Sequence, residues 1–440
     1  MAQVLKTNRR RFLQCGCGTA AALAVPCWVP GTALGLDGST APSNRIRIAA
    51  IGLGFAWPMF LGRDDVRYVA VCDVRKERRD AGKAQVEAKQ GAGTCSAYND
   101  FRDVLARDDV DAVYVATPDH WHALITIAAA KAGKHVYCQK PLSRTIAEGR
   151  AVVDAVNRYG IVFQHGTQQR HDVQMLFGCE LVLNGYIGQL QHVKIGSPQG
   201  QVCGPQPVEP VPEGLDWEMW LGPAPWAPFT SLRIQSHPWY HISDYSLGYI
   251  AGWGVHHADS AMQGSGLDGY AGPIEIDARG EFPTEGLFDN PHLWNMNFRF
   301  ANGVTWNWTD TPSWEPKKDW NDPVRHPMGI RFEGTEGWVF IWRGEVDAYP
   351  KKLFQVQIGP RDKVHLRDEL PGDFIDCVRQ GRRTCAPVEV AHRSTTLCSI
   401  VAIGMLLGRK LTWDPGREEF VNDEGANRLR ARHMREPWSI

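Results

Sequence analysis

The sequence has almost no net charge and no long apolar run in its main body. Its 48 lysines and arginines oppose 49 aspartates and glutamates, so the formal net charge at pH 7 is −1. Because nucleic acids and anionic membrane surfaces attract an excess of positive charge, this balance favours neither as a partner. No stretch after the N-terminal segment has the ~20 consecutive apolar residues that cross a bilayer. We therefore expect no nucleic-acid partner and no membrane insertion.

The cysteines lack the spacing of a metal or redox site. There are 11 of them, none forms a Cys-x-x-Cys pair, and three fall in the N-terminal segment. Closely paired cysteines are the usual signature of zinc and redox sites, so no metal is expected. Cys72 and Cys138 stand inside apolar runs. Buried free thiols are the favoured interpretation of the remaining eight, and disulfides are the alternative.

The N-terminal segment differs from the rest of the chain. In "TNRRRFLQCGCGTAAALAVPCWVPGTALG", Arg9 and Arg10 precede a short run of small, weakly apolar residues. This pattern resembles a twin-arginine export signal, and the run is too short to span a membrane. We expect residues 1–35 to be a signal peptide and residues 36–44 a linker, which predicts a periplasmic or extracellular protein. A basic tail without an export function is the alternative.

Residues 45–165 alternate between apolar strands and helices with short joins. The segments "RIRIAAI", "VRYVAVC", "VDAVYVA", "HVYC" and "IVFQH" suit buried strands, and "ALITIAAAKAGK" and "TIAEGRAVVDAVNRYG" suit helices. Such alternation is typical of a parallel sheet with right-handed crossovers. We therefore predict an α/β fold whose N-terminal domain is a doubly wound Rossmann sheet. Ligands of such sheets bind beyond the carboxyl ends of the strands.

A glycine turn and an acid mark a dinucleotide site at that edge. Gly52 would form a tight turn, and Gly54 would let the backbone approach a pyrophosphate near the next helix N-terminus. Asp73 follows 21 residues after Gly52. Its carboxylate would bind an adenosine ribose and repel a 2′-phosphate, which favours NAD over NADP, although Arg75 leaves the choice open. Trp57 replaces the third glycine of the pattern in "GLGFAW", so the next helix is expected to start farther out.

The second half of the chain suits an α+β domain. Residues 166–415 include "WNMNFRFANGVTWNWTD", which alternates on both sides of Asn302-Gly303 and predicts a hairpin in an open, largely antiparallel sheet. Residues 416–440 are expected to form a C-terminal tail. Fourteen of the 17 tryptophans follow residue 215. We expect four of them to pack in the sheet core or an interface: Trp306, Trp308, Trp338 and Trp342. Three others lie near loops and are candidates for stacking on sugar rings: Trp226, Trp239 and Trp253.

These segments together resemble the Gfo/Idh/MocA oxidoreductase family, named for glucose–fructose oxidoreductase and inositol dehydrogenase. The resemblance rests on "IAAIGLG", "AVCD", "VATPDHWHALITIAAAKAGKHVYCQKPLSRT" and "GWGVHHADSA", and extends over residues 45 to about 415. It implies that Lys140 lies between the nicotinamide ribose and the substrate, that His122 lies beside the nicotinamide, and that the second sheet forms a homo-oligomer contact. The expected cofactor-binding residues are Gly52, Leu53, Gly54, Phe55, Asp73, Val74, Thr117, Pro118, His120, His122, Gln139 and Lys140.

The same resemblance assigns a proton acceptor in "GWGVHHADSA". His256 matches the family's catalytic histidine, but Gly252 stands where the family carries an aspartate. A proton relay would then run through His257, Asp259, Tyr245 or water. His256 and Asp259 are three residues apart and would share a helix face. The alternative is that these histidines have only a structural role. A metal site is disfavoured because adjacent histidines point in different directions on a helix.

Three functions remain open from the sequence. The first is an oxidoreductase that uses NAD, or less favourably NADP, on a hydroxyl of a sugar, polyol or glycoside. The second is a glycoside hydrolase that oxidises carbon 3 transiently, as some relatives, including α-N-acetylgalactosaminidases, do. The third is a non-catalytic sugar-binding relative. An exported enzyme has no fresh supply of cofactor, so we expect NAD to be tightly bound and recycled.

Overall fold

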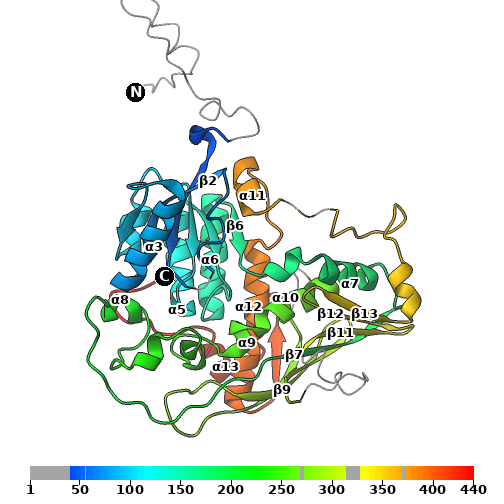
Figure 1. Ribbon diagram of the computed structural model, residues 1–440. Coiled ribbons are helices and arrows are strands. Elements are labelled where there is room, and N and C mark those ends of the chain that lie inside the picture. Colours follow the sequence, from blue (N-terminus) through cyan, green and yellow to red (C-terminus); the bar gives the residue numbers. More distant parts are fainter. Residues whose placement is uncertain (1–39, 55, 268–271, 314–327, 369, 371) are drawn as a thin grey trace, which may run out of the picture. The chain divides into compact units, whose positions relative to one another are not determined.

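The computed structural model describes residues 40–54, 56–267, 272–313, 328–368, 370 and 372–440 (Figure 1). The predicted signal peptide and residues 36–39 of the predicted linker lie outside these residues. Residues 46–440 form one compact unit. Residues before it include a short 3-10 helix, η1 (Pro42–Asn44).

The first half of the compact unit is the predicted Rossmann sheet. Six parallel strands lie in the order β3-β2-β1-β4-β5-β6. Their apolar runs are almost wholly buried, as expected for a sheet covered on both faces. The strands are β1 (Ile46–Ile51), β2 (Val66–Cys72), β3 (Ser96–Tyr98), β4 (Ala112–Val115), β5 (His135–Cys138) and β6 (Phe163–His165). The helices between them are α3 (Lys76–Gln90), α4 (Phe101–Leu105), α5 (Asp119–Lys131) and α6 (Ile146–Tyr159).

The connection after β1 corrects one expectation. Described residues 56–62 form successive turns, and the expected helix that would follow the glycine turn is absent from them. The indole of Trp57 is buried and packs edge-on against Tyr68, 5.9 Å between ring centroids, and the Tyr68 hydroxyl donates to the Trp57 carbonyl at 3.0 Å. The indole occupies the space that a third glycine would leave for a helix, so the chain leaves β1 in turns instead.

The second half contains a nine-stranded mixed sheet in the order β13-β12-β11-β7-β10-β9-β8-β14-β15. Among the described strands, β7 and β10 pair in parallel and the other neighbours are antiparallel. The predicted hairpin at Gly303 is confirmed. The strands are β7 (Leu190–Ser197), β8 (Glu275–Glu281), β9 (Leu293–Arg299), β10 (Thr305–Asp310), β11 (Gly329–Gly334), β12 (Trp338–Trp342), β13 (Glu345–Tyr349), β14 (Leu411–Asp414) and β15 (Glu419–Phe420).

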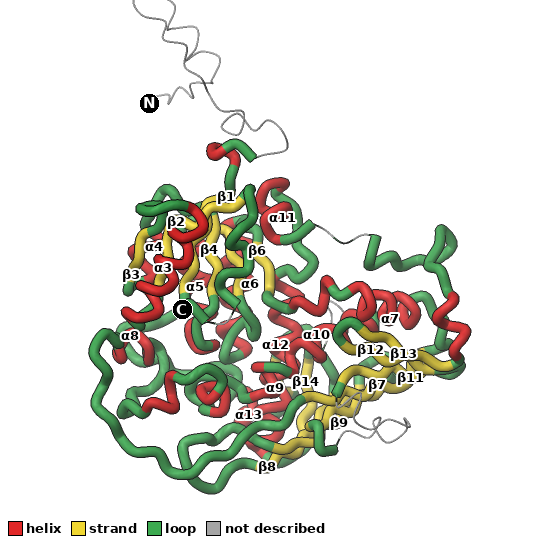
Figure 2. The backbone as a smooth tube through the Cα atoms, in the orientation of Figure 1, coloured by secondary structure: helices red, strands yellow, loops and turns green. Residues whose placement is uncertain are grey.

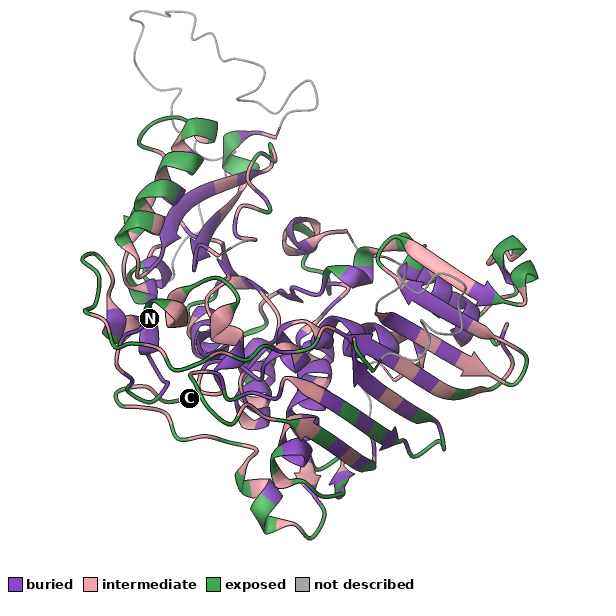
Figure 3. Ribbon diagram, turned by 60° about the horizontal axis from the view of Figure 1, so that its bottom comes forward, coloured by how far each residue is buried: buried purple, intermediate pink, exposed green. Residues whose placement is uncertain are grey.

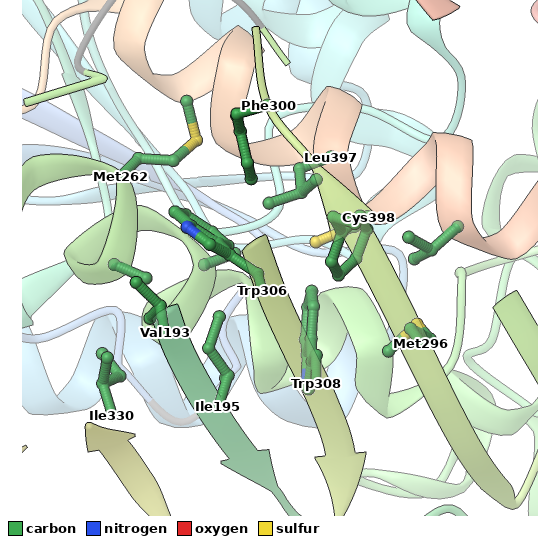
Figure 4. Close-up of a cluster of buried hydrophobic side chains, with 14 of the residues drawn as sticks. Val193, Ile195, Met262, Met296, Phe300, Trp306, Trp308, Ile330, Leu397 and Cys398 are labelled. Carbon is green, nitrogen blue, oxygen red and sulfur yellow. The ribbon is translucent and has the colours of Figure 1, made fainter. Parts of the chain in front are cut away.

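One face of this sheet is covered by three helices: α7 (Val173–Leu183), α10 (Gly254–Gly264) and α12 (Val388–Leu407) (Figure 2). Residues along β9 alternate between buried and exposed, which gives the banded strands of Figure 3. Trp306 and Trp308 point from β10 into the resulting core (Figure 4), as expected for sheet-core tryptophans. A Cβ on Gly254 would lie 2.2 Å from the Trp308 ring, so the glycine lets α10 lie close to the sheet.

The remaining elements are short. The segment between β7 and α9 contains a short helix, α8. These elements are η2 (Gln168–His171), α8 (Trp217–Leu221), η3 (Ser231–Ile234), η4 (Pro238–His241), α9 (Tyr249–Gly252), η6 (Lys351–Gln355), α11 (Phe374–Gln380) and α13 (Glu424–Arg428).

The C-terminal segment packs against the Rossmann half. The Trp438 ring lies 4.7 Å from the Trp121 ring and 6.4 Å from the Phe101 ring, between centroids. Figure 1 marks the C-terminus beside this part of the fold. Residues of α11 and the start of α12, such as Phe374 and Val388, also belong to the cores of the Rossmann sheet. The cofactor half is therefore completed by residues from the far end of the chain.

The eight described cysteines are all free thiols, and six of them are buried, as expected. The helix α12 has the length and composition of a membrane span, but 78% of its most apolar window is buried inside the fold. Central helices of folded domains share that composition, so this helix is weak support for a membrane span. No group of three or more metal-ligating side chains occurs within the described ranges.

A buried carboxylate joins three segments of the fold. Asp259 of α10 is fully buried and pairs with Arg170, whose Nε and Nη2 donate to it at 2.6 and 3.0 Å. The hydroxyls of Thr167, just after β6, and Ser394 of α12 donate at 2.8 and 2.6 Å. Since α12 also packs against α6 of the Rossmann half and β8 of the second sheet, this carboxylate lies where the two halves meet.

Removing this carboxylate should destabilise the whole fold. Asp259→Ala removes the carboxylate that pairs with the buried Arg170 guanidinium, and breaking a buried ion pair in this way typically costs about 3–5 kcal/mol. We expect that loss in the free energy of unfolding measured by denaturant titration. Glu275→Gln, which breaks the exposed ion pair with Arg299, is the control and should leave the free energy of unfolding almost unchanged, because exposed ion pairs contribute little. Equal stability of the two variants would contradict the anchoring role.

Candidate active site

A cavity of about 730 Å³ lies along the carboxyl ends of the parallel strands. Its walls combine the ends of β1, β2, β4 and β5 with segments of the second half: η4, α9, the start of α10 and the turn after β12. Small-molecule and cofactor sites typically enclose about 300–1,000 Å³. The cavity therefore has the size and the position expected of a ligand site in a doubly wound sheet.

The glycine turn brings two strand ends together. Gly52 has φ +81°, and a Cβ there would lie 2.5 Å from the Thr117 amide nitrogen. A Cβ on Gly54 would lie 3.1 Å from the Ala116 carbonyl oxygen. Only glycine therefore suits position 52, and the backbone at the carboxyl end of β1 stays open to a ligand. This cradle fits the pyrophosphate of a dinucleotide.

Asp73 holds this turn from the end of β2. Its two carboxylate oxygens accept from the Leu53 and Arg75 amides, each at 2.9 Å. The side chain is buried yet lines the cavity. Carboxylate oxygens have further lone pairs, so the arrangement leaves capacity for a ribose hydroxyl. Asp73 thus has a structural task in addition to the predicted ligand-binding one.

Most of the predicted cofactor-binding residues line the cavity. The ones that do are Gly52, Leu53, Gly54, Asp73, Val74, Thr117, Pro118, His122, Gln139 and Lys140. Phe55 lies outside the described residues. His120 does not line the cavity, which departs from the expectation: it is fully buried, its Nε2 lies 3.1 Å from the Trp220 carbonyl oxygen, and burial lowers its pKa to about 3. His120 therefore packs α5 against α8.

His122 ties two strand ends around the cavity. Its Nδ1 lies 2.6 Å from the Pro141 carbonyl oxygen and its Nε2 lies 2.9 Å from that of Thr117. Two carbonyl contacts favour the charged ring, but burial and the nearby Lys140 outweigh them and lower the pKa of His122 to about 4. The neutral ring donates at one nitrogen only. Its position fixes the segment that carries Lys140.

Lys140 bridges the two halves of the protein. Its Nζ donates to the Tyr240 hydroxyl at 3.0 Å and to the Gly252 carbonyl at 2.5 Å. Burial lowers the pKa of Lys140, while the nearby Asp119 acts in the opposite direction. The cation is thus held at the strand end, facing elements of the second half.

Asp119 is a buried acid that the sequence analysis passed over. It begins α5, accepts from the Ser246 hydroxyl at 2.6 Å, and its other oxygen has no partner among the described residues. Burial raises its pKa to about 7, against the effect of Lys140. An acid directly after a strand of the ligand edge, in "TPDHWH", was the signal that could have identified it.

Tyr240 occupies the space that an aspartate at position 252 would need. A Cβ on Gly252 would lie 2.7 Å from Cδ1 of the Tyr240 ring. The ring also lies 5.0 Å from Lys140 Nζ, measured to its centroid. Burial raises the pKa of Tyr240 well above 10, so the hydroxyl keeps its proton. The departure from the family pattern at Gly252 is therefore matched by a tyrosine that contacts the same lysine.

His256 lines the cavity, but none of the three side chains expected to relay its proton hydrogen-bonds to it within the described residues. Its Nδ1 is buried without a hydrogen-bond partner among the described residues. Burial, followed by the charges of Lys140 and Arg343, lowers its pKa well below the ordinary value, so the ring is neutral. A neutral imidazole can accept a proton.

The three relay candidates lie away from the cavity. His257 is buried, with its Nδ1 2.7 Å from the Gly196 carbonyl oxygen. Asp259 is committed to the ion pair with Arg170, and the Tyr245 hydroxyl accepts from Arg233 at 2.9 Å. Sharing a helix face with His256 did not bring Asp259 to the site, because its partners come from remote segments.

The aromatic lining agrees in part with the sequence analysis. Trp239 and Trp253 line the cavity, and Trp239 stacks on Tyr240 with 3.9 Å between centroids. Trp226 is 63% exposed and does not line it. Arg343, from the turn after β12, also lines the cavity and carried no recognisable signal in the sequence. Flat aromatic rings and a few polar groups form a surface that suits a small polar ligand with C–H faces.

A doubly wound sheet with this glycine turn, and a second sheet that closes the cavity with a lysine and a histidine, define a dinucleotide-binding oxidoreductase of two linked halves. The chain belongs to the Gfo/Idh/MocA oxidoreductase family. Residues 46–167 match its NAD-binding Rossmann fold, and residues 204–285 and 332–440 match its C-terminal alpha/beta domain. The cofactor is therefore a nicotinamide dinucleotide.

Individual relatives match over shorter stretches. The chain is 36% identical over 158 residues to a levoglucosan dehydrogenase of Pseudarthrobacter phenanthrenivorans, which is 33% of this chain and 39% of that relative. It is 30% identical over 175 residues to a glycosyl hydrolase family 109 protein of Shewanella sp. (strain W3-18-1), which is 37% of each chain. These matches thus span less than half the length of either relative.

A solved structure matches most of the fold. The aldose-aldose oxidoreductase from Caulobacter crescentus, crystallised with glycerol, gives a TM-score of 0.59 at 19% identity and covers 84% of this chain and 99% of its own. The likeness supports the arrangement of the two sheets.

The close packing of Tyr240 against Gly252 can be tested with a single and a double substitution. Gly252→Asp places a side chain where the Tyr240 ring lies, so the single variant should lower turnover at least 10-fold by displacing Lys140. Gly252→Asp combined with Tyr240→Ala removes the clash and should recover part of the loss. Tyr240→Ala alone is the control. Wild-type turnover of Gly252→Asp would contradict the tight packing.

Proposed function

We propose that this protein is an NAD(P)-dependent oxidoreductase that acts on a hydroxyl-bearing carbon of a sugar, polyol or glycoside. One observation carries the proposal: Lys140 of the Rossmann half and His256 of the second half line the same cavity as the glycine turn. Oxidation of a carbinol needs a cation near the developing alkoxide and an acceptor for the hydroxyl proton. The cavity supplies both.

The roles follow from the state of each group. A nicotinamide, when bound, accepts the hydride from the substrate carbon. His256 takes the hydroxyl proton, because its lowered pKa keeps the ring neutral near pH 7. Lys140 and the protonated Tyr240 hydroxyl orient the substrate oxygen, and Lys140 offsets the charge that develops on it. Trp239 and Trp253 provide flat surfaces for a sugar ring.

We propose NAD as the cofactor, tightly bound, with NADP as the less favoured choice. Asp73 lies where the adenosine ribose would bind, and its negative charge would repel a 2′-phosphate. Arg75 and Arg78 also line that end of the cavity, and they are the groups that would admit NADP.

A glycoside hydrolase that uses the same redox step is the second candidate. The match to a glycosyl hydrolase family 109 protein favours it. In this scheme the substrate is oxidised, loses its leaving group, adds water and is reduced again, so NAD returns to its starting state. Cleavage of a glycoside without net NADH would support it. A non-catalytic sugar-binding protein is the third candidate, suggested by Trp57 and Gly252 in place of the usual family residues.

We also propose that the protein is exported by the twin-arginine route and is periplasmic or extracellular. Arg9 and Arg10 before a short, small-residue run support this proposal. A folded protein leaving by this route can carry bound NAD with it. We further propose a homo-oligomer through the open face of the nine-stranded sheet, which in β9 presents polar residues such as Asn295 and Asn297.

The catalytic roles predict different effects on turnover and on cofactor binding. Lys140→Met keeps the length and removes the charge, so turnover should fall about 10²- to 10⁴-fold while NAD affinity changes little. His256→Asn should lower turnover similarly. Both are measured on a substrate found by screening sugars and glycosides. Near-wild-type turnover of both variants would reject the assignment and favour a binding protein.

The pH dependence provides a further check on His256. Its pKa is lowered, and it must be unprotonated to act, so its acidic limb should lie below the ordinary histidine value of about 6.5. His256→Asn should abolish that limb. An inflection near pH 7 that vanishes in Asp119→Asn would instead identify the Asp119 carboxyl, whose pKa is raised to about 7, as the titrating group.

The choice of cofactor is tested at Asp73. Asp73→Ala should weaken NAD binding and reduce the preference for NAD over NADP, because it removes both the ribose acceptor and the support of the Leu53 amide. Fluorescence titration with each cofactor measures both effects. Arg78→Met, which removes a nearby positive charge, is the matched control and should weaken the binding of NADP but not that of NAD. Unchanged affinities in Asp73→Ala would remove it from the site.

A further inference from the structure

The charges that line the cavity are unevenly distributed. Four cationic side chains line it, and Asp73 is the one carboxylate among its described lining residues. Asp73 lies at the end of β2 beside Arg75 and Arg78, where an adenosine would bind. Lys140 and Arg343 also line the cavity, and the charges of both act on the His256 ring. The Asp119 carboxyl, which acts on Lys140, is buried and does not line the cavity, so the lining around His256 is electropositive.

Arg343 is held beside His256 by one buried amide. With the Gln169 amide oriented so that its oxygen faces Arg343, that oxygen accepts from Arg343 Nε at 3.1 Å. In the same orientation the amide nitrogen donates to the His256 carbonyl at 2.9 Å. The guanidinium lies over the Trp253 ring, 4.6 Å from its centroid. Arg343 is thus an exposed side chain that Gln169 and Trp253 hold in position.

No carboxylate within the described part of the chain forms an ion pair with Arg343. The acid that acts on it from a distance is Asp172, which caps α7 and accepts from the Gly344 amide at 2.7 Å. Arg343 lines the cavity as an exposed residue. Its two terminal guanidinium nitrogens make no hydrogen bond within the described part of the chain, so both can donate to an anion.

We propose that the substrate carries a carboxylate and that Arg343 binds it, so that the substrate class is a sugar acid or its glycoside. This inference rests on the proposed sugar-oxidoreductase function. A guanidinium offers two parallel N–H groups that match the two oxygens of a carboxylate. Trp253 keeps the guanidinium plane fixed, and Trp239 is available to the sugar ring. The hydroxyl to be oxidised then lies between Lys140 and His256.

A bound carboxylate would also adjust the reacting groups. A negative charge near a base favours its protonated form and raises its pKa. Neutralising Arg343 would therefore raise the depressed pKa of His256 and make it a stronger proton acceptor. Sugars without the charge would leave the histidine a weak base. The substrate's anionic group would thus contribute to reaction as well as to binding.

The test measures binding of matched sugar pairs by calorimetry, with the full-length protein and NAD present. The probes are D-glucuronate and D-glucose, methyl β-D-glucuronide and methyl β-D-glucoside, D-galacturonate and D-galactose, and D-glucose 6-phosphate. We expect the wild type to bind the acid of at least one pair about 10- to 100-fold more tightly, the range that charge-assisted hydrogen bonds provide. Arg343→Met should remove that preference and leave NAD affinity unchanged, and Arg343→Lys should keep part of it.

A second arginine offers a matched control. The Arg331 guanidinium lies 4.5 Å from the centroid of Trp338 on the same sheet but does not line the cavity. Arg331→Met should leave the preference intact. A wild type without a preference for the acid in any pair overturns the proposal, and this result does not depend on any variant folding. Tighter binding of the phosphate ester than of every acid also overturns it.

The outcomes separate this inference from the proposed function. Selective binding of an acid that is lost in Arg343→Met, without cofactor reduction or glycoside cleavage, would support the carboxylate site and reject the enzymatic function. Turnover of neutral sugars without any acid preference would support the function and reject the carboxylate site.

Discussion

The buried ion pair between Asp259 and Arg170 is the interaction on which the site depends. It joins α10 to the segment after β6 and, through Ser394, to α12. His256 lies three residues earlier on the same helix, so its position against the cavity follows from where this carboxylate is held. Gly254 lets α10 lie close to Trp308 and so sets the distance between this helix and the sheet. Asp259, which was expected to relay a proton, instead holds the helix that carries His256.

Burial disfavours the charged forms of three ionisable groups at or beside the cavity. Burial lowers the pKa of Lys140 and His256 and raises that of Asp119. Groups in this state change protonation when a ligand brings or removes a charge. Gly252 and Tyr240 have a related effect. Where the family carries an aspartate at position 252, Lys140 instead contacts the neutral hydroxyl of Tyr240. Within the described residues Lys140 forms no ion pair, although the nearby Asp119 carboxyl acts on its charge.

Features encoded in short stretches of sequence could be predicted, and features made by distant segments could not. The strands, the hairpin at Gly303 and the strand-end position of Lys140 follow from local periodicity and turn chemistry. The commitment of Asp259 depends on Arg170 and Ser394, which are 89 and 135 residues away in the chain. Tyr240 and Arg343 belong to no local pattern, so only the folded chain brings them to the cavity. The described residues 56–62 form turns instead of a helix because Trp57 packs against Tyr68, and the sequence showed only that Trp57 replaces a glycine.

The docking of Trp438 against Trp121 and Phe101 has a consequence for biosynthesis. A ribosome makes the whole of the parallel sheet hundreds of residues before it makes the indole that covers these two rings. During that interval the nascent Rossmann half exposes an aromatic surface at the edge of its own ligand cavity. The nucleotide half therefore cannot bury these rings by itself and depends on the segment around residue 438 emerging and docking against it.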